Sequence, residues 1–249
     1  NYMNRHLSFE NINGKKIFSI LSEPKNALGK LVIMSHGFRG TSTGPARSFV
    51  NFTRLLTSHG FSTFRFDQPN CGNSEGDFLD VSFSEWIKTI THFTEKYITA
   101  GYEVVLLGQS MGATASLIAT SQKGIQSKIP CVLLWVPDPE SNYAKTSDEI
   151  AEEGGEKYNT SFWREAYEMD FFKCLNEYNG RIHLVYGEKD RYVSKDLRDI
   201  TIQSVQNKKG EIMILKGQDH SPWDYDLAQQ VYEEQTKFLE NYFTDKTAV

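Results

Sequence analysis

Two hydrophobic patterns alternate along most of this chain. Short, continuous runs of apolar residues predict strands at residues 30–37, 61–67, 102–110, 131–137, 181–190 and 210–220. Between them, apolar residues recur three and four positions apart, which predicts helices at residues 45–59, 84–99, 111–121, 195–205 and 224–242. Strands that are apolar on both faces belong to a largely parallel sheet with helices on both sides. The pattern therefore predicts an α/β fold.

Two segments depart from this alternation. Residues 6–12 and 15–23 flank Asn13-Gly14, a dipeptide typical of tight hairpin turns, so the chain is expected to begin with a hairpin. From Asp138 to Tyr178 we predict no strand, and the helical signals there are weak and polar. We interpret residues 138–178 as a cap inserted after the sixth core strand of a single domain that spans residues 1–249.

Composition and charge exclude several classes of protein. The chain has 249 residues, of which 39% are hydrophobic and 24% are charged, so it is expected to fold. Its net charge of −5 argues against nucleic-acid binding. No apolar run approaches the roughly 20 residues of a membrane span. Three widely spaced cysteines form neither a disulfide framework nor a zinc motif, and the first residues lack a signal-peptide core. We therefore expect a cytoplasmic protein without a metal; its oligomeric state stays open.

Candidate chemistry begins with Ser110, which lies between Gly108 and Gly112 in a G-x-S-x-G pattern. The motif stands between a predicted strand and a predicted helix, at the sheet edge where open α/β sheets bind ligands. A serine at such a turn adopts a strained backbone and projects its hydroxyl outward, which requires small neighbours. The alternative is an ordinary strand-to-helix turn. We predict that Ser110 is a nucleophile.

A serine hydroxyl needs a base that takes its proton. Of the six histidines, only His220 is both distant in sequence and in a loop after a strand at the same sheet edge. Two aspartates compete to orient this base, Asp190 after the strand at 181–187 and Asp138 after the strand at 131–137. We favour Asp190, because the order Ser110, Asp190, His220 is the order this strand–turn–helix motif uses.

Acyl transfer also requires donors for a developing oxyanion, and two backbone N–H groups normally suffice. The N–H of Met111 follows the nucleophile. The second donor is expected in the loop after the strand at 30–35, where Phe38 is our candidate. His36 is expected to order this loop by hydrogen bonding.

Five motifs together resemble the α/β-hydrolase superfamily in order and spacing: "SHGF", "RFDQPNCGNSEG", "GQSMG", "GEKDRYV" and "GQDH". The resemblance covers nearly the whole chain and is greatest to the microbial cinnamoyl and feruloyl esterases, which are cytosolic and carry a cap after the sixth strand. Monoacylglycerol lipases and other small carboxylesterases share many of these features. The chain departs from the usual pattern at Asn70 and Cys71, which leaves the entrance of the pocket undefined.

The resemblance implies an α/β-hydrolase fold with a mostly parallel central sheet, and a serine carboxylic-ester hydrolase that needs no cofactor. We expect its substrate to be a small, neutral ester of a short or hydroxycinnamoyl acid, with Asp138 binding a phenolic hydroxyl. Aromatic residues in the cap favour a planar acyl group: Tyr143, Tyr158, Phe162, Trp163, Tyr167, Phe171, Phe172 and Tyr178. The alternatives are a monoacylglycerol-lipase-like or peptidase-like hydrolase and a ligand-binding receptor on the same scaffold.

Overall fold

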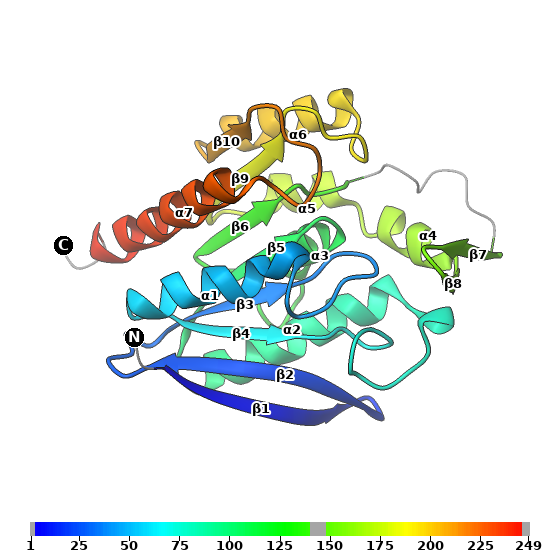
Figure 1. The fold of residues 1–249 in the computed structure, drawn as a ribbon, viewed down its shortest axis with the longest axis horizontal. Coiled ribbons are helices and arrows are strands. Elements are labelled where there is room, and N and C mark those ends of the chain that lie inside the picture. The colour runs from blue at the N-terminus through cyan, green and yellow to red at the C-terminus, as the bar shows by residue number, and fades with distance from the viewer. Residues whose placement is uncertain (1–2, 140–147, 246–249) are drawn as a thin grey trace.

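The central sheet has eight strands in the order β1-β2-β4-β3-β5-β6-β9-β10 (Figure 1). The computed structural model describes residues 3–139 and 148–245. The sheet strands are β1 (Met3–Ile12), β2 (Lys15–Pro24), β3 (Lys30–Ser35), β4 (Ser62–Phe66), β5 (Glu103–Gln109), β6 (Cys131–Trp135), β9 (Arg181–Gly187) and β10 (Glu211–Leu215). The pairs β1–β2 and β2–β4 are antiparallel, and the pairings from β4 through β3, β5, β6 and β9 to β10 are parallel.

Alternate residues of the central strands face two separate hydrophobic cores. In β3, Leu31 and Ile33 belong to one core, whereas Val32 and Met34 belong to the other. All four side chains are fully buried. This explains why the strands read as continuous apolar runs, because both faces of a parallel sheet are covered.

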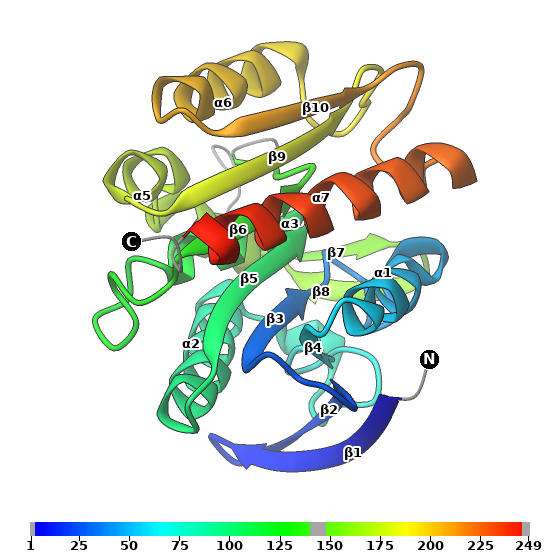
Figure 2. The same cartoon turned by 90° about the vertical axis from the view of Figure 1, so that its left-hand side faces the viewer.

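Helices cover both faces of the sheet (Figure 2). One face carries α1 (Ser48–Ser58), which follows the short 3₁₀ helix η1 (Pro45–Arg47), and α7 (Tyr225–Asp245). The other face carries α2 (Phe83–Thr99), preceded by η2 (Phe78–Asp80), α3 (Met111–Ala119), α5 (Phe171–Glu177) and α6 (Lys195–Asn207). Among the described residues, no helix is both long enough and apolar enough to cross a membrane. The predicted architecture is confirmed, including the hairpin at Asn13-Gly14.

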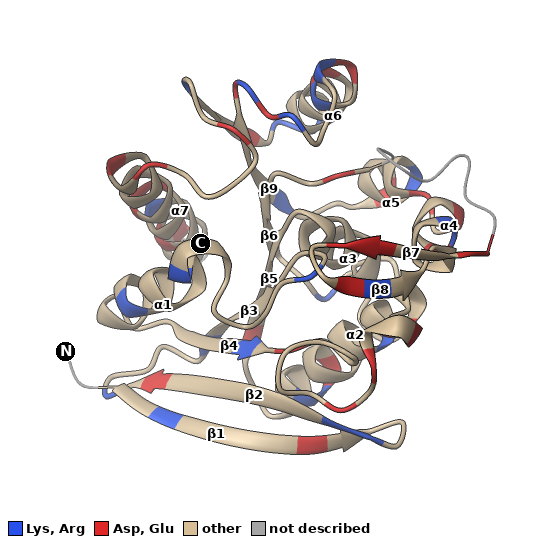
Figure 3. Ribbon diagram, turned by 45° about the vertical axis from the view of Figure 1, so that its right-hand side comes forward, with Lys and Arg blue, Asp and Glu red and all other residues tan. Residues whose placement is uncertain are grey.

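The prediction that residues 138–178 contain no strand is wrong. Strands β7 (Ile150–Glu153) and β8 (Glu156–Asn159) form an antiparallel hairpin, which is followed by α4 (Ser161–Glu168) and α5. The two strands are short and rich in charge, so they lack the apolar run that marks the sheet strands. Acidic residues gather on this hairpin (Figure 3).

Glu165 of α4 joins this inserted segment to the main body. Its carboxylate accepts hydrogen bonds from the Ser82 hydroxyl (2.9 Å) and the Phe83 backbone N–H (3.1 Å) at the start of α2. A carboxylate at a helix N-terminus satisfies free N–H groups and interacts favourably with the helix dipole. These hydrogen bonds at the start of α2 therefore hold α4 in place beside the carboxyl ends of the strands.

A buried histidine lies on the face of the sheet under α7. His183 of β9 lies in the interior, where the Gln235 side chain contacts its Nδ1 at 3.1 Å and also accepts the indole N–H of Trp135 at 2.7 Å. Burial lowers the pKa of His183 from 6.5 to about 4. His183 is thus a neutral core residue.

This burial predicts a pH-dependent stability. Because the pKa of His183 is lower in the folded than in the unfolded chain, the unfolded chain binds the extra proton, and stability falls as pH drops from about 6.5 towards 4. Desolvation also lowers the pKa of buried His36, which likewise reduces the stability of the folded chain as pH drops. Between pH 7 and pH 5, wild type should lose about 1–2 kcal/mol more unfolding free energy than His183→Gln. Urea titrations at both pH values measure this, and equal losses would contradict it.

Candidate active site

Ser110 stands at the turn between β5 and α3 in a conformation that few non-glycine residues adopt. Its φ is 56° and its ψ is −121°. The turn is held on both sides, because the Ser110 N–H donates to the Trp135 carbonyl (2.8 Å) and the Ser110 carbonyl accepts the Ala113 N–H (2.9 Å). Strain of this kind persists only where the surrounding structure enforces it, and it is concentrated at functional sites.

The glycines of the motif are required by close backbone contacts. A Cβ atom at Gly108 would lie 2.1 Å from the Gly112 carbonyl oxygen, and one at Gly112 would lie 2.1 Å from the Ser35 carbonyl oxygen. Neither oxygen belongs to a flexible side chain that could move away. Helix α3 can thus approach β3 and β5 only with glycine at both positions, which is what places Ser110 above the sheet edge.

The structure brings Ser110, His220 and Asp190 together in one line of hydrogen bonds. His220 Nε2 lies 2.7 Å from Ser110 Oγ, and His220 Nδ1 lies 2.7 Å from Asp190 Oδ2. Both His220 and Asp190 are buried, with 7% and 6% of their surfaces exposed. With Nδ1 protonated and bound to the carboxylate, Nε2 is the nitrogen that can accept the serine proton.

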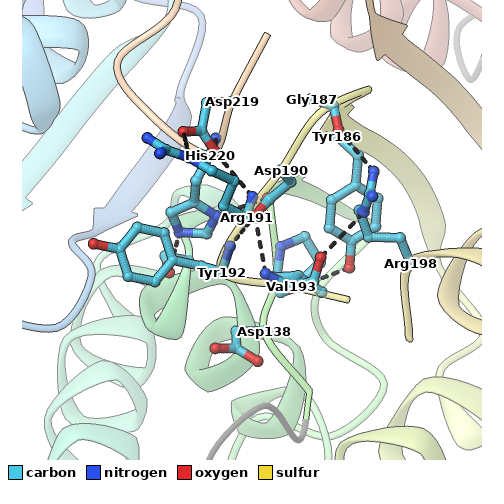
Figure 4. Close-up of polar contacts among 12 residues, drawn as sticks. Asp138, Tyr186, Gly187, Asp190, Arg191, Tyr192, Val193, Arg198, Asp219 and His220 are labelled. Carbon is cyan, nitrogen blue, oxygen red and sulfur yellow. Dashed lines mark hydrogen bonds and ion pairs between the residues drawn. The ribbon is translucent and has the colours of Figure 1, made fainter. Parts of the chain in front are cut away.

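Backbone groups fix the Asp190 carboxylate. Its Oδ1 accepts the N–H groups of Tyr192 (2.8 Å) and Val193 (2.9 Å), which leaves Oδ2 for the imidazole (Figure 4). The Tyr192 ring packs on the His220 ring with centroids 5.1 Å apart. The loop after β9 therefore sets the direction in which the carboxylate points.

Asp219 joins the two loops that carry this pair. It accepts the Arg191 backbone N–H (2.9 Å), the Arg191 Nε–H (2.7 Å) and the His220 N–H (2.7 Å) (Figure 4). The pKa of Asp219 is lowered to about 2, chiefly by the hydrogen bond from the Arg191 backbone N–H. Asp219 is thus ionised at neutral pH and holds the loop of His220 against the loop of Asp190.

The loop after β3 packs against the inserted segment. His36 contacts the Gly37 carbonyl through Nδ1 (2.8 Å) and accepts the Gln68 N–H at Nε2 (2.9 Å), so it orders the loop as a neutral imidazole. The Phe38 ring packs against Tyr158 (4.8 Å) and Trp163 (4.7 Å), measured between ring centroids.

Arg39 adds a polar link between the same loop and the β7–β8 hairpin. Its guanidinium lies 3.7 Å from a Glu153 oxygen and 3.4 Å from a Glu156 oxygen. The inserted segment therefore contacts directly the loop that carries Phe38.

A cavity of about 460 Å³ opens over Ser110. Phe38 and Met111, predicted as oxyanion donors, both line it, together with His220 and Asp138. Tyr143, the first aromatic residue predicted for the cap, lies outside the described residues. Sequence reasoning missed Arg39 and Tyr192 as lining residues. The available signal was their position in loops that follow strands at the carboxyl edge of the sheet.

Asp138 also lines this cavity, but it is not part of the hydrogen-bonded line of Ser110, His220 and Asp190. Figure 4 shows its carboxylate apart from the Asp190–His220 pair. Its backbone is fixed by Thr114 of α3, whose hydroxyl donates to the Asp138 carbonyl at 2.9 Å. Asp190, not Asp138, is thus the aspartate that the fold brings to His220.

The residues that depart from the usual pattern lie away from the cavity. Asn70 accepts a hydrogen bond from Lys15 Nζ (2.8 Å) and donates to the Asp77 carbonyl (2.6 Å), so it stabilises its own loop. Cys71 is buried in the core, and burial raises the pKa of its thiol. Neither residue is among the described residues that line the cavity. The departure changes a structural loop next to β4.

Potential metal ligands lie apart from one another in the part of the chain that the structure describes. Within residues 3–139 and 148–245, no three His, Cys, Asp or Glu side chains come together in a way that could hold a metal ion. Cys71, Cys131 and Cys174 are buried and form no disulfide.

Comparisons with known proteins agree with this architecture. The sheet order and the strained turn at Ser110 between β5 and α3 define an α/β-hydrolase fold. The sequence model of the alpha/beta hydrolase family matches residues 32–234. The chain therefore belongs to the alpha/beta hydrolase family. No curated protein sequence matches the chain.

Solved structures show the same fold at low sequence identity. Est1E from Butyrivibrio proteoclasticus, with ferulic acid bound, is 21% identical with a TM-score of 0.83, covering 95% of this chain and 99% of Est1E. A soluble variant of monoglyceride lipase from Saccharomyces cerevisiae, in complex with a substrate analog, is 15% identical with a TM-score of 0.75, covering 96% of each chain. The α/β hydrolase GrgF from Penicillium sp. sh18 is 14% identical with a TM-score of 0.76, covering 97% of this chain and 99% of GrgF. At these identities the likeness concerns the fold.

Proposed function

We propose that this protein is a serine esterase that hydrolyses small, neutral carboxylic esters through Ser110, His220 and Asp190. The observation that carries the proposal is the continuous line of two 2.7 Å contacts from Ser110 Oγ to the Asp190 carboxylate. A binding protein on the same scaffold has no need for a strained serine, a base and a buried orienting acid in one line. No metal or organic cofactor enters the proposal.

In the first half of the reaction, Ser110 Oγ attacks the ester carbonyl carbon while its proton passes to His220 Nε2. The carbonyl oxygen becomes an oxyanion, which the backbone N–H groups of Phe38 and Met111 stabilise. The bond to the alcohol oxygen then breaks, and the alcohol leaves with the proton from His220. An acyl-serine remains.

In the second half, water attacks the acyl carbon and gives one proton to His220 Nε2. Breakdown of the second oxyanion returns that proton to Ser110 Oγ and releases the acid. Asp190 keeps the proton on Nδ1 and stabilises the imidazolium in both halves.

The finer substrate class is a short or aryl acyl group. The cavity is within the usual range for small ligands, and Phe38 and Trp163 offer aromatic surface to a planar acyl group. Asp138 lines the same cavity, where its carboxylate can accept a hydrogen bond from a phenolic hydroxyl. Glu153 and the other acidic residues of the hairpin disfavour polyanionic substrates and anionic lipid surfaces.

A panel of esters tests this substrate class. We expect kcat/KM for methyl ferulate or methyl caffeate, or for a butyrate ester, to exceed that for the laurate ester by about tenfold or more. Anionic lipid vesicles should not activate the enzyme. Strong preference for laurate, or activation by such vesicles, would instead indicate the monoacylglycerol-lipase-like alternative.

A further inference from the structure

A second, smaller cavity lies behind the nucleophile, between the beginnings of α1 and α7. These helices run side by side on one face of the sheet (Figure 2). The cavity has a volume of about 160 Å³. It shares Pro45, Gln109 and Ser221 with the larger cavity over Ser110. The two cavities are therefore adjacent, and one of the shared residues, Gln109, directly precedes Ser110.

Aromatic rings with fixed positions wall this second cavity. Trp135 packs against Trp223 and Tyr232, with ring centroids 5.4 and 5.9 Å away. Hydrogen bonds anchor both indoles, because Trp135 Nε1–H donates to Gln235 Oε1 (2.7 Å) and Trp223 Nε1–H donates to the His220 carbonyl (3.2 Å). The walls are thus formed before any ligand enters.

The lining of this cavity suits a neutral molecule. None of the described residues that line it is Asp, Glu, Lys, Arg or His. Ser48 is one of the lining residues, only 8% exposed, and its hydroxyl has no hydrogen-bond partner among the described residues. A buried hydroxyl without a partner is costly, and a polar atom of a bound molecule would satisfy it.

We propose that this cavity is the subsite for the alcohol half of the ester and takes a neutral alcohol that carries one six-membered ring. The inference rests on the proposed esterase function. The cavity is large enough for such a ring, since an apolar cavity of about 150 Å³ accommodates benzene. Flat aromatic walls favour an aromatic ring, which packs against them in offset or edge-on contacts.

The position of His220 assigns the cavity to the alcohol half. When the bond between the acyl carbon and the alcohol oxygen breaks, that oxygen takes the proton from His220 Nε2, so it must lie within hydrogen-bond reach of this nitrogen. The residues that directly follow His220, from Ser221 to Trp223, line the second cavity. Phe38, Asp138 and the cap residue Trp163 line only the first cavity, where the acyl half lies.

Substitution within α7 tests the subsite. Ala228 lines the cavity, and phenylalanine there would fill it. With the acyl group held as acetate, wild type should prefer benzyl acetate to methyl acetate in kcat/KM by about tenfold or more, and Ala228→Phe should lower this ratio about tenfold. Ala228→Val, a smaller change, should give an intermediate ratio. Gln230→Phe, on the exposed surface of the same helix, is the matched control and should keep the wild-type ratio.

A binding measurement separates this inference from the proposed function. In Ser110→Ala, benzyl alcohol should quench tryptophan fluorescence saturably, and addition of Ala228→Phe should abolish that quenching. If no ester is turned over but this binding is seen, the esterase proposal fails and the cavity remains a ring-binding site. If wild type turns over esters without preferring benzyl acetate, or Ala228→Phe changes instead the preference between acetate and phenylacetate esters, the alcohol subsite is refuted.

Discussion

Replacing Ser110 with alanine should lower kcat/KM for an aryl ester by on the order of 10³-fold or more. The expected cause is loss of the atom that attacks the ester carbonyl, since the Ser110 hydroxyl is the group 2.7 Å from His220 Nε2. Alanine has the same backbone requirements as serine at this turn, so the fold should be retained. Steady-state kinetics and urea unfolding of the same preparation measure both effects.

Ser121→Ala is the control for this substitution, because Ser121 lies just after α3 and away from the cavity over Ser110. It should retain wild-type turnover. Turnover near the wild-type level in Ser110→Ala would mean that another residue is the nucleophile.

Replacing Asp190 with asparagine should lower kcat about 10⁴-fold, as loss of the orienting charge does in related triads. The hydrogen bonds around Asp190 explain why. The asparagine carbonyl oxygen would still accept the hydrogen bonds from the N–H groups of Tyr192 and Val193. Its NH₂ group would therefore point towards His220 Nδ1. The imidazole would then hold its proton on Nε2, where it can no longer accept the proton of Ser110.

Asp138→Asn is the matched control for the same chemical change. Asp138 lines the cavity but stands apart from His220, so its substitution should lower kcat for an acetate ester less than about tenfold. For hydroxycinnamate esters the effect should be chiefly on KM. A larger loss of kcat in Asp138→Asn than in Asp190→Asn would assign the orienting acid to the end of β6.

The choice between Asp190 and Asp138 shows what the hydrophobic pattern could not settle. Both follow apolar strands, so hydrophobic pattern alone places both at the same edge of the sheet. The strand order decides, because β9 is the neighbour of β10, with Gly187 opposite Leu215, whereas β6 is separated from β10 by β9. The order of parallel strands depends on contacts far apart in the chain, which local pattern does not encode.

The β7–β8 hairpin was predictable from its turn residues, although its strands lack hydrophobic periodicity. Gly154 and Gly155 form a two-residue turn in which both φ angles are positive, and Glu153 pairs with Glu156 across it. A Gly-Gly dipeptide between short strands is typical of such turns. The two strands are short, charged and mostly exposed or half exposed, so the periodicity that reveals the buried sheet is missing.

The contacts of Phe38 and Arg39 with the inserted segment had no such signal. Their contacts reach residues more than a hundred positions away, in α4 and the β7–β8 hairpin. A loop residue that meets an inserted segment can be placed only when the fold of both is known.

The proposed mechanism requires Ser110 to be the residue that carries the acyl group. Treatment with a fluorophosphonate, followed by mass spectrometry of the digested protein, identifies the serine that reacts. We predict one equivalent of label on Ser110, complete loss of ester hydrolysis in step with labelling, and no labelling of Ser110→Ala or of protein whose His220 is replaced by alanine. Label on a different serine, or full hydrolysis with Ser110 blocked, would contradict the account.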